Sequence, residues 1–297
     1  VFDYPTLTEV GAYVSWCMGL SKQSTTSEAN PLFQDKTASG QAFLGLIHIS
    51  TADKCCSDTI TVHPLLVWDI QQANNGPGKL AVRFRHCLKD IPNFDVHLFA
   101  VRAGEASFVD PSHRLILLAS FDLVSRVNSA HLSVERQDVA VGIQWSEYQS
   151  SLLNHYHQWS LPPTGNANSV ISGRISYTYG MRGASVCVDT ACSSVLTATH
   201  VTLMARGMQL WGLVAGANIL LLELNFAIFN SAGMMDAEGR CKTLDSAAGG
   251  YVRAEACGMM HVYRRDSMVD EQALGISTVI NQNGRSSSLT APNGLSQ

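Results

Sequence analysis

A single cysteine, Cys192, stands in the run VDTACSSVL at residues 188–196, among small and mostly polar neighbours. The apolar stretch RGASVCV precedes this run, and the apolar-rich stretch LTATHVTLMARGM follows it. This order predicts a strand, a sharp turn and a helix, with Cys192 at the turn. A thiol attacks as its thiolate, and the N–H groups at a helix N-terminus favour negative charge. The pattern therefore predicts a nucleophile whose turn could also stabilise an oxyanion on an acyl carbonyl.

The neighbours of Cys192 fit this chemistry and also a simpler interpretation. Small side chains at Ala191, Ser193 and Ser194 would let a substrate approach closely. Asp189, at the end of the predicted strand, could tie the turn together through backbone N–H groups. However, free cysteines are also common as small buried hydrophobes, and serines at this place could act only as helix caps. Position and composition leave both interpretations open.

The elements that would hold this turn alternate along the chain. Buried strands are predicted at 137–145, 183–189 and 213–222, and a helix at 193–207. Strands that alternate with helices favour a layered α/β fold with a partly parallel sheet. The apolar run 209–229 contains polar groups that would be unfavourable in lipid, so we predict a buried strand and a loop and no membrane span.

The bulk composition narrows the classes of function. The 297 residues are 46% hydrophobic and 15% charged, which suits a globular chain with a large core. The formal net charge of −4 and the lack of a long basic run argue against nucleic-acid binding. The eight cysteines form no CxxC pair and no zinc-finger spacing, so we predict no metal site, reduced thiols and a cytoplasmic protein. The first residue, Val1, suggests a piece of a longer polypeptide.

Longer motifs extend around the cysteine, at 164–194, 231–258 and 281–294. In these segments, and above all in VDTACSS, the chain resembles the β-ketoacyl synthases, the condensing enzymes of polyketide and fatty-acid synthases. The motifs follow one another in the family's order. The resemblance is to the ketosynthase domain of a modular type I polyketide synthase rather than to a stand-alone fatty-acid enzyme.

This resemblance implies a division of the chain. The opening VFDYPTL is similar to the last part of an acyl carrier domain, so residues 1–20 are assigned to the end of a carrier-like domain. Residues 21–42, rich in Ser, Thr, Gln and Lys, are assigned to a linker. Residues 43–297 are assigned to the N-terminal half of a ketosynthase. No motif for attachment of phosphopantetheine is recognised.

The resemblance also implies a fold and a reaction. The fold expected is thiolase-like: layered α/β with a mixed, mostly parallel sheet, and a homodimer when complete. Cys192 would be the catalytic residue, which takes an acyl group from a carrier thioester. A malonyl-type extender would then lose CO₂, and its carbanion would attack the acyl group to form a C–C bond. Both groups would arrive on the phosphopantetheine of an acyl carrier domain, with no cofactor or metal bound by this segment itself.

Some features depart from the family pattern. The family's two catalytic histidines belong to its second half, in motifs after 281–294, and none of the ten histidines here lies in such a motif. His200, eight residues after Cys192, is predicted to be a packing residue. We therefore expect this chain to need the remaining half of the ketosynthase, and to condense very poorly alone.

Two further departures concern the backbone. Ala254 and Ala256 stand where the family usually has glycines, and would strain the chain if their φ angles were positive. The family's opening strand is not recognised in 42–57. An inactive ketosynthase-like scaffold, for dimerisation or carrier docking, is therefore the alternative function. A cysteine hydrolase is a third alternative, but this sequence lacks the G-x-C-x-G turn that such an enzyme would need around Cys192.

Overall fold

The structure is a computed structural model. The residues that it describes are 41–50, 61–62, 84–88, 91, 93–126, 137–155, 163–204, 211–265, 273–275, 278–288, 291 and 293. The expected carrier-like end, 1–20, lies outside them, as does all but the last two residues of the expected linker, 21–42. The helices and strands are β1 (Gln41–Ser50), β2 (Thr61–Val62), β3 (Phe84–Arg85), α3 (Ala103–Ala106), α4 (Pro111–Arg126), β4 (Asp138–Gly142), α5 (Glu147–His155), α6 (Asn168–Tyr179), β5 (Ser185–Val188), α7 (Ser194–Met204), β6 (Trp211–Asn218), α8 (Glu223–Ser231), β7 (Ala256–Arg265) and β8 (Ala273–Gly275).

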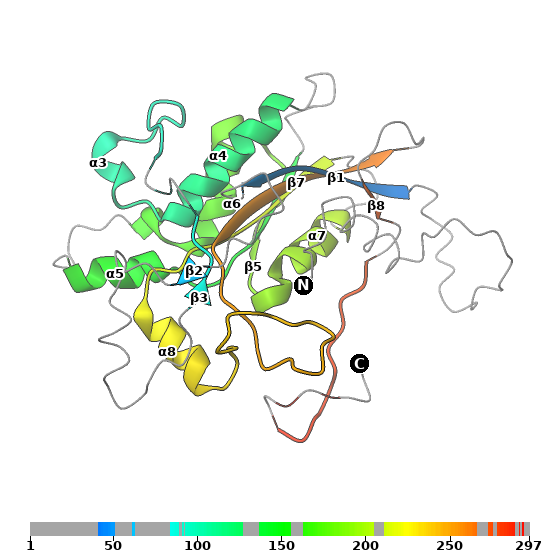
Figure 1. Ribbon diagram of the computed structural model, residues 1–297. Coiled ribbons are helices and arrows are strands. Elements are labelled where there is room, and N and C mark those ends of the chain that lie inside the picture. The colour runs from blue at the N-terminus through cyan, green and yellow to red at the C-terminus, as the bar shows by residue number, and fades with distance from the viewer. Residues whose placement is uncertain are drawn as a thin grey trace, which may run out of the picture.

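A six-stranded sheet, in the order β5-β4-β6-β7-β1-β8, forms the centre of the fold (Figure 1). Strand β4 pairs in parallel with both β5 and β6, so that Gly142 lies opposite Val188 on one side and Gly216 on the other. Strand β7 runs antiparallel to β6 and to β1, and β8 runs antiparallel to β1. Because β1, β4, β5 and β6 share one direction, the sheet is mixed and mostly parallel, as predicted.

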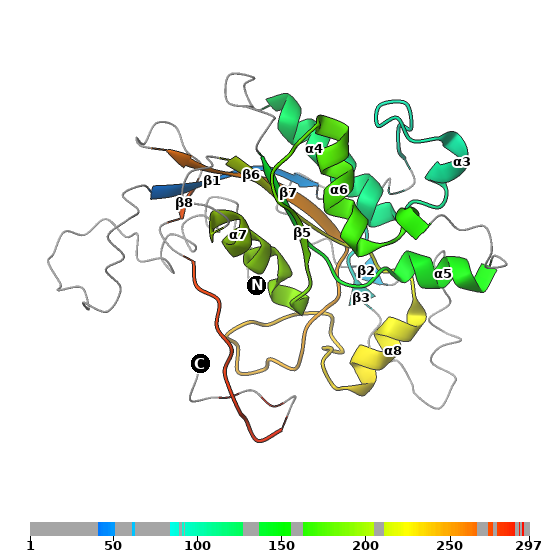
Figure 2. The same cartoon turned by 180° about the vertical axis from the view of Figure 1, so that it is seen from behind.

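Helices cover both faces of this sheet (Figures 1 and 2), with α4 and α6 on one face and α7 on the other. Successive side chains of β4 therefore enter different layers: Val139 packs with Ile171 of α6, and Ala140 packs with Ala198 of α7. Every residue of β4 is buried. This two-sided burial explains why the strand reads as an unbroken apolar run rather than an alternating one.

Local signals fix the ends of the helices that flank the sheet. Helix α4 begins at Pro111, a residue suited to the first helical position. Its preceding residue, Asp110, accepts a hydrogen bond from the Ser112 N–H at 2.7 Å, as a helix cap does. Helix α6 ends at Tyr179 and is followed by Gly180, whose φ of 69° is the left-handed conformation that glycine adopts without strain.

Two sequence-based expectations are wrong. Strand β1 forms at Gln41–Ser50, where no opening strand was recognised, and it pairs with β7 along most of its length. The strand expected at 213–222 ends at Asn218, and the segment after it contains helix α8 rather than only a loop. The apolar run hid this helix because it has no polar break between the two elements. Among the described residues, no helix is long and apolar enough to cross a membrane.

Candidate active site

Cys192 lies on the turn between strand β5 and helix α7, as the sequence predicts. Strand β5 ends at Val188, a short 3₁₀ turn spans Ala191–Ser193, and α7 begins at Ser194. The thiol is exposed. Because β4, β5 and β6 are parallel neighbours, their carboxyl ends meet at the same edge of the sheet, and this is the edge that carries Cys192.

Side chains of the turn itself hold its shape. The Asp189 carboxylate accepts the Ala191 N–H at 3.0 Å, which confirms the predicted tie. The Thr190 N–H donates to Ser194 Oγ at 2.9 Å, and that hydroxyl donates to the Ala191 carbonyl at 2.6 Å. The Ser193 hydroxyl donates to the Thr190 carbonyl at 2.8 Å. The polar residues around the cysteine therefore have a structural role: their hydrogen bonds fix the turn that carries the thiol.

The residue before the cysteine has an unusual backbone. Ala191 has a φ of 56°, in the left-handed region that residues other than Gly, Asn and Asp rarely adopt. This conformation costs about 1–2 kcal/mol for alanine, and it places the turn tightly between strand and helix. Such strain is found where a functional constraint requires it.

Glycines in the sheet allow α7 to lie very close to the strands. A Cβ atom on Gly142 would stand 2.5 Å from the Val195 nitrogen and 2.6 Å from the Ser194 carbonyl carbon. A Cβ atom on Gly216 would collide with the Val195 side chain. The first turn of α7, and with it the cysteine turn, therefore packs directly against the backbone of β4 and β6 at Gly142 and Gly216.

The other described thiols differ from Cys192 in exposure. Cys87 and Cys187 are half-buried, and Cys187 donates to the Asn168 carbonyl at 2.8 Å. Burial raises the pKa of Cys257 to about 12, so that thiol remains protonated. Cys241 is exposed like Cys192, but it follows α8 on a loop rather than preceding a helix. Of the five thiols in the described ranges, Cys192 alone stands at the N-terminus of a helix that packs on the sheet.

Three of the described histidines have surroundings that the structure defines. The Nδ1 atom of His200 lies 2.9 Å from Thr278 Oγ1, which makes His200 a packing contact between α7 and the segment after β8, as predicted. His113 and His261 are buried in α4 and β7. Neither Ala254 nor Ala256 has a positive φ, so the condition for strain at these two positions is not met.

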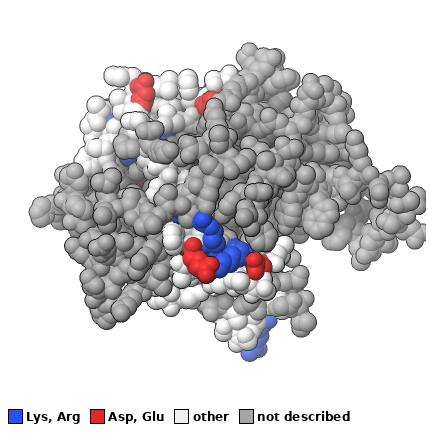
Figure 3. All heavy atoms as spheres, in the orientation of Figure 1, with Lys and Arg blue, Asp and Glu red and all other residues white. Residues whose placement is uncertain are grey.

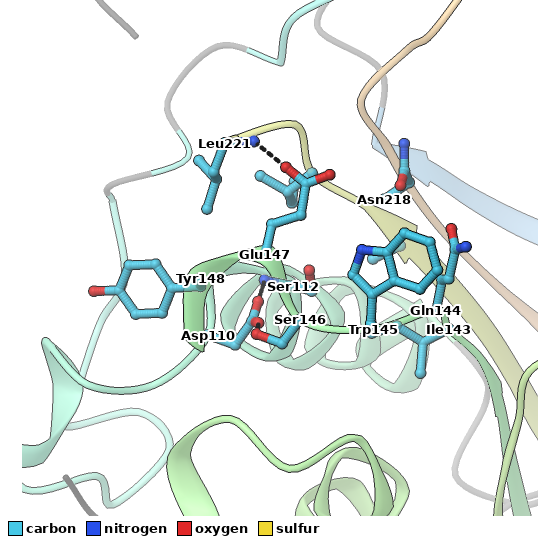
Figure 4. Close-up of a pocket in the computed structure, with 12 residues that line it drawn as sticks. Asp110, Ser112, Ile143, Gln144, Trp145, Ser146, Glu147, Tyr148, Asn218 and Leu221 are labelled. Atoms are coloured by element: carbon cyan, nitrogen blue, oxygen red, sulfur yellow. Dashed lines mark hydrogen bonds between the residues drawn. The ribbon is translucent and has the colours of Figure 1, made fainter. Parts of the chain in front are cut away.

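A pocket that sequence reasoning missed opens at the same edge of the sheet (Figure 4). It has a volume of about 380 Å³ including its open mouth, and it lies between the segment after β4, the start of α4 and the end of β6. Trp145, Glu147 and Asn218 line it. No sequence signal identified this pocket, because its walls come from three elements that are far apart in the chain.

In the described part of the chain, charged side chains pair with one another rather than gather into an ion site. Within the described ranges, no group of three metal-ligating side chains is found. On the described part of the face in Figure 3, acidic and basic side chains lie next to one another. Lys242 lies close to two carboxylates: its Nζ is 2.7 Å from Glu238 Oε2 and 3.7 Å from Asp236 Oδ2.

Comparison with known proteins agrees with this geometry. Residues 53–267 match the model of the family described as "Beta-ketoacyl synthase, N-terminal domain". One component of the phenolphthiocerol/phthiocerol polyketide synthase of Mycobacterium tuberculosis is 34% identical over 231 residues, which cover 74% of this chain and 15% of that protein. Polyketide synthase GfsB of Streptomyces halstedii is 30% identical over 328 aligned positions, which cover 100% of this chain and 6% of that protein.

A solved structure shares the fold. The ketosynthase from module 6 of the bacillaene synthase of Bacillus subtilis 168 superposes with a TM-score of 0.70 at 27% sequence identity, over 80% of this chain and 41% of that one. The fold is accordingly thiolase-like, as predicted. The chain spans only a small part of the length of the polyketide synthases it matches. The family match, the polyketide synthase relatives and this shared fold lead to one conclusion: the chain belongs to the β-ketoacyl synthase family, and its matched region is that family's N-terminal domain.

Proposed function

We propose that this chain is the acyl-accepting part of a ketosynthase, an acyltransferase of the 3-oxoacyl-[acyl-carrier-protein] synthase type, with Cys192 as its nucleophile. The observation that carries the proposal is the exposed thiol of Cys192, which lies at the N-terminus of α7 on a turn held by hydrogen bonds. A helix N-terminus favours the anionic forms of both the thiol and the carbonyl oxygen under attack.

The first step transfers an acyl group without any cofactor bound to the chain. The Cys192 thiolate attacks the carbonyl carbon of an acyl thioester, and the new C–S bond gives a tetrahedral oxyanion. Collapse of this intermediate breaks the original C–S bond and expels the carrier's phosphopantetheine thiolate, which takes up a proton. The acyl group then remains on Cys192 as a new thioester.

The second step makes the C–C bond. A malonyl group on a carrier domain loses CO₂, and the carbanion attacks the acyl carbonyl on Cys192, which leaves as its thiolate. Charge on this path needs donors near the thiol, and no hydrogen bond from an imidazole to the thiol is found among the described residues. We therefore propose that the family's second half supplies these groups, and that the complete ketosynthase works as a homodimer with its carrier domain.

The state of the thiols supports the cytoplasm as the place of this reaction. The five cysteines of the described ranges are free, and an exposed catalytic thiol requires a reducing compartment to stay active. Neighbouring synthase domains and the acyl carrier domain are the proposed partners in that compartment.

Acyl loading tests the proposal directly. The full chain is incubated with a small acyl thioester, hexanoyl-N-acetylcysteamine, and the adduct is located by peptide mass spectrometry. We expect one acyl group on Cys192, its loss in Cys192→Ser, and unchanged loading in Cys241→Ser, which removes the other exposed thiol. Equal loading of both thiols, or none on Cys192, would favour the inactive scaffold instead.

A further inference from the structure

Two buried carboxylates line the pocket at the end of β4, and they differ in how their charge is compensated (Figure 4). Glu147 Oε1 lies 3.2 Å from Nη2 of the buried Arg253. Its other oxygen accepts the N–H groups of Leu221 and Leu222 at 2.6 and 2.8 Å. Asp110, in contrast, forms no ion pair within the described part of the chain. The pocket therefore carries one carboxylate that lacks a cationic partner.

Hydrogen bonds from the protein occupy only part of the Asp110 carboxylate. Its Oδ1 accepts the Ser112 N–H at 2.7 Å, and its Oδ2 accepts the Ser146 hydroxyl. A carboxylate has about four lone-pair sites, so about two remain. Arg114, on the same helix, lies over the ring of Tyr148, with its Cζ 6.0 Å from the centroid. Because a buried charge is unfavourable unless it is paired, this carboxylate favours a ligand that brings positive charge.

Two further polar groups of the pocket offer acceptors. Asn218 donates through Nδ2 to the Ala254 carbonyl at 2.7 Å, which leaves its Oδ1 as an acceptor. Ser112 lines the pocket and is more than nine-tenths buried. Its hydroxyl makes no hydrogen bond to any described residue, since only its backbone N–H is engaged. An unpartnered hydroxyl on a buried residue is a position where a ligand group can be accommodated.

Trp145 gives the pocket an aromatic wall. Its indole ring is half-exposed, and it stacks on Phe229 with a centroid distance of 6.4 Å and an interplanar angle of 7°. This contact occupies one face of the indole, and the other face is free to meet a ligand. A cation is attracted to the face of an aromatic ring, and tryptophan is the strongest partner. The apolar side chains of Ile143 and Ile219 complete this part of the wall.

We propose that this pocket binds a small alkylammonium ion. An ammonium group has three N–H donors and no acceptor, which matches the Asp110 carboxylate, the Ser112 hydroxyl and the Asn218 amide oxygen. The alkyl chain lies against Trp145, whose ring face also attracts the cation. Glu147 stays paired within the protein and shapes the wall. This binding goes beyond the proposed acyl transfer and does not depend on it.

Tryptophan fluorescence of the full chain tests the proposal. Ethylammonium chloride is titrated to about 0.2 M, because a ligand with so few atoms binds only in the millimolar range. Trp145→Phe supplies the background from the other tryptophans. We expect a saturable change in the wild type that is absent from Trp145→Phe, and no saturable change with ethanol, sodium acetate or potassium chloride.

These three reagents separate charge from size. Ethanol is a neutral molecule of similar size, acetate is an anion, and potassium chloride supplies an inorganic cation at the same ionic strength. An equal response to ethanol would show that the pocket does not select charge. An equal response to potassium chloride would show that it does not select an ammonium group. Either result, or no response to ethylammonium, would overturn the proposal.

Asp110→Asn isolates the charge. Asparagine has the same size and caps helices as well as aspartate does, so the start of α4 is kept. We expect ethylammonium to bind at least tenfold more weakly. Asp245→Asn is the matched control: Asp245 Oδ1 accepts the Ala247 N–H at 2.8 Å, two residues along the chain, as Asp110 does with Ser112, but it does not line the pocket. Its binding should be unchanged, and wild-type affinity in Asp110→Asn would contradict the proposal.

Ser112→Ala keeps the test decisive if Asp110→Asn does not fold. It removes only a hydroxyl that makes no hydrogen bond within the described structure, so unfolding in urea should remain close to that of the wild type. We expect ethylammonium to bind about threefold more weakly, and an unchanged affinity would count against the site. Because the titration uses no acyl donor, its failure leaves the proposed function untouched, and a chain that fails to load acyl groups can still bind ethylammonium.

Discussion

Single residues decide how the nucleophile is presented, and Ala191 is the most telling of them. Its φ of 56° is imposed by the bonds that Asp189 and Ser194 make to its backbone. Alanine is the smallest L-residue that can occupy such a position. The strain it stores is offset by the packed elements on either side, and it sets the direction of the chain at Cys192, just before α7 begins.

Substitutions at Ala191 should separate strain from side-chain size. Ala191→Gly should keep the turn and change the free energy of unfolding by no more than about 1 kcal/mol, because relief of strain is balanced by greater freedom of the unfolded chain. Ala191→Val should destabilise the protein and slow alkylation of Cys192, since a β-branched residue is a severe outlier at positive φ. Urea unfolding and thiol labelling measure both effects, and a fully tolerated valine would contradict them.

His113 gives a prediction about pH. Burial lowers the pKa of His113 to about 4 from 6.5, Asp110 opposes this shift, and Arg174 adds to it. The unfolded chain therefore takes up a proton near pH 6.5 that the folded protein refuses until about pH 4. The free energy of unfolding should fall as the pH drops through this window, by up to ~3 kcal/mol.

The variant that removes the titration is His113→Leu. Both ring nitrogens of His113 are buried without partners in the described structure, so an apolar replacement of similar size should not destabilise the protein. Urea unfolding at pH 7 and at pH 4.5 should show a smaller difference in His113→Leu than in the wild type. An equal difference in both proteins would assign the acid sensitivity to other groups.

At the scale of elements, the distance between α7 and strand β4 is set by Gly142. Gly142→Ala would place a methyl group against the backbone of Ser194 and Val195, which cannot move aside as a side chain can. We expect a loss of about 1–3 kcal/mol in stability and a slower reaction of Cys192, because the first turn of α7 must shift.

Gly173→Ala is the control for this change. Gly173 lies within α6, and a Cβ atom there would meet nothing within 4 Å. Alanine should stabilise the helix by ~0.5–1 kcal/mol and leave Cys192 labelling as it is. If Gly142→Ala behaved like Gly173→Ala both in stability and in Cys192 labelling, the close packing of α7 on β4 would not determine the position of the cysteine turn.

The strands and helices also show which parts of the structure could be predicted from the sequence and which could not. The strands and the turn around Cys192 were predicted correctly because local apolar runs and small residues mark them. Strand β1 was missed because its pairing with β7 depends on residues about 200 positions away, which no local pattern records. The pair of Glu147 and Arg253 has the same origin, since only the folded chain brings these distant charges together.

At the scale of the whole molecule, α7 presents an apolar face to solvent. Leu196 is 74% exposed and Met204 60% on its outer side, and Val279 is 83% exposed next to Thr278, which contacts α7 through His200. Large apolar side chains that lie together on a surface mark an interaction site, and α7 carries two exposed ones. In the complete ketosynthase we expect the family's second half to cover it.

This surface can be tested in the chain as it stands. Leu196→Glu combined with Val279→Glu should reduce self-association in sedimentation velocity and reduce binding of a hydrophobic dye. The stability in urea should change by less than about 0.5 kcal/mol, because both side chains are already exposed. If dye binding were unchanged, the apolar surface would lie elsewhere on the molecule.

The place of β1 in the sheet has a consequence for biosynthesis. Its partner β7 follows about 200 residues later in the chain, and β8, its other neighbour, follows β7. At ~5–20 residues per second, a ribosome delivers β7 on the order of 10–40 s after β1 has emerged. Throughout that interval, the nascent β1 has neither of its hydrogen-bonding neighbours, so its backbone N–H and C=O groups stay open to pairing with another chain during translation.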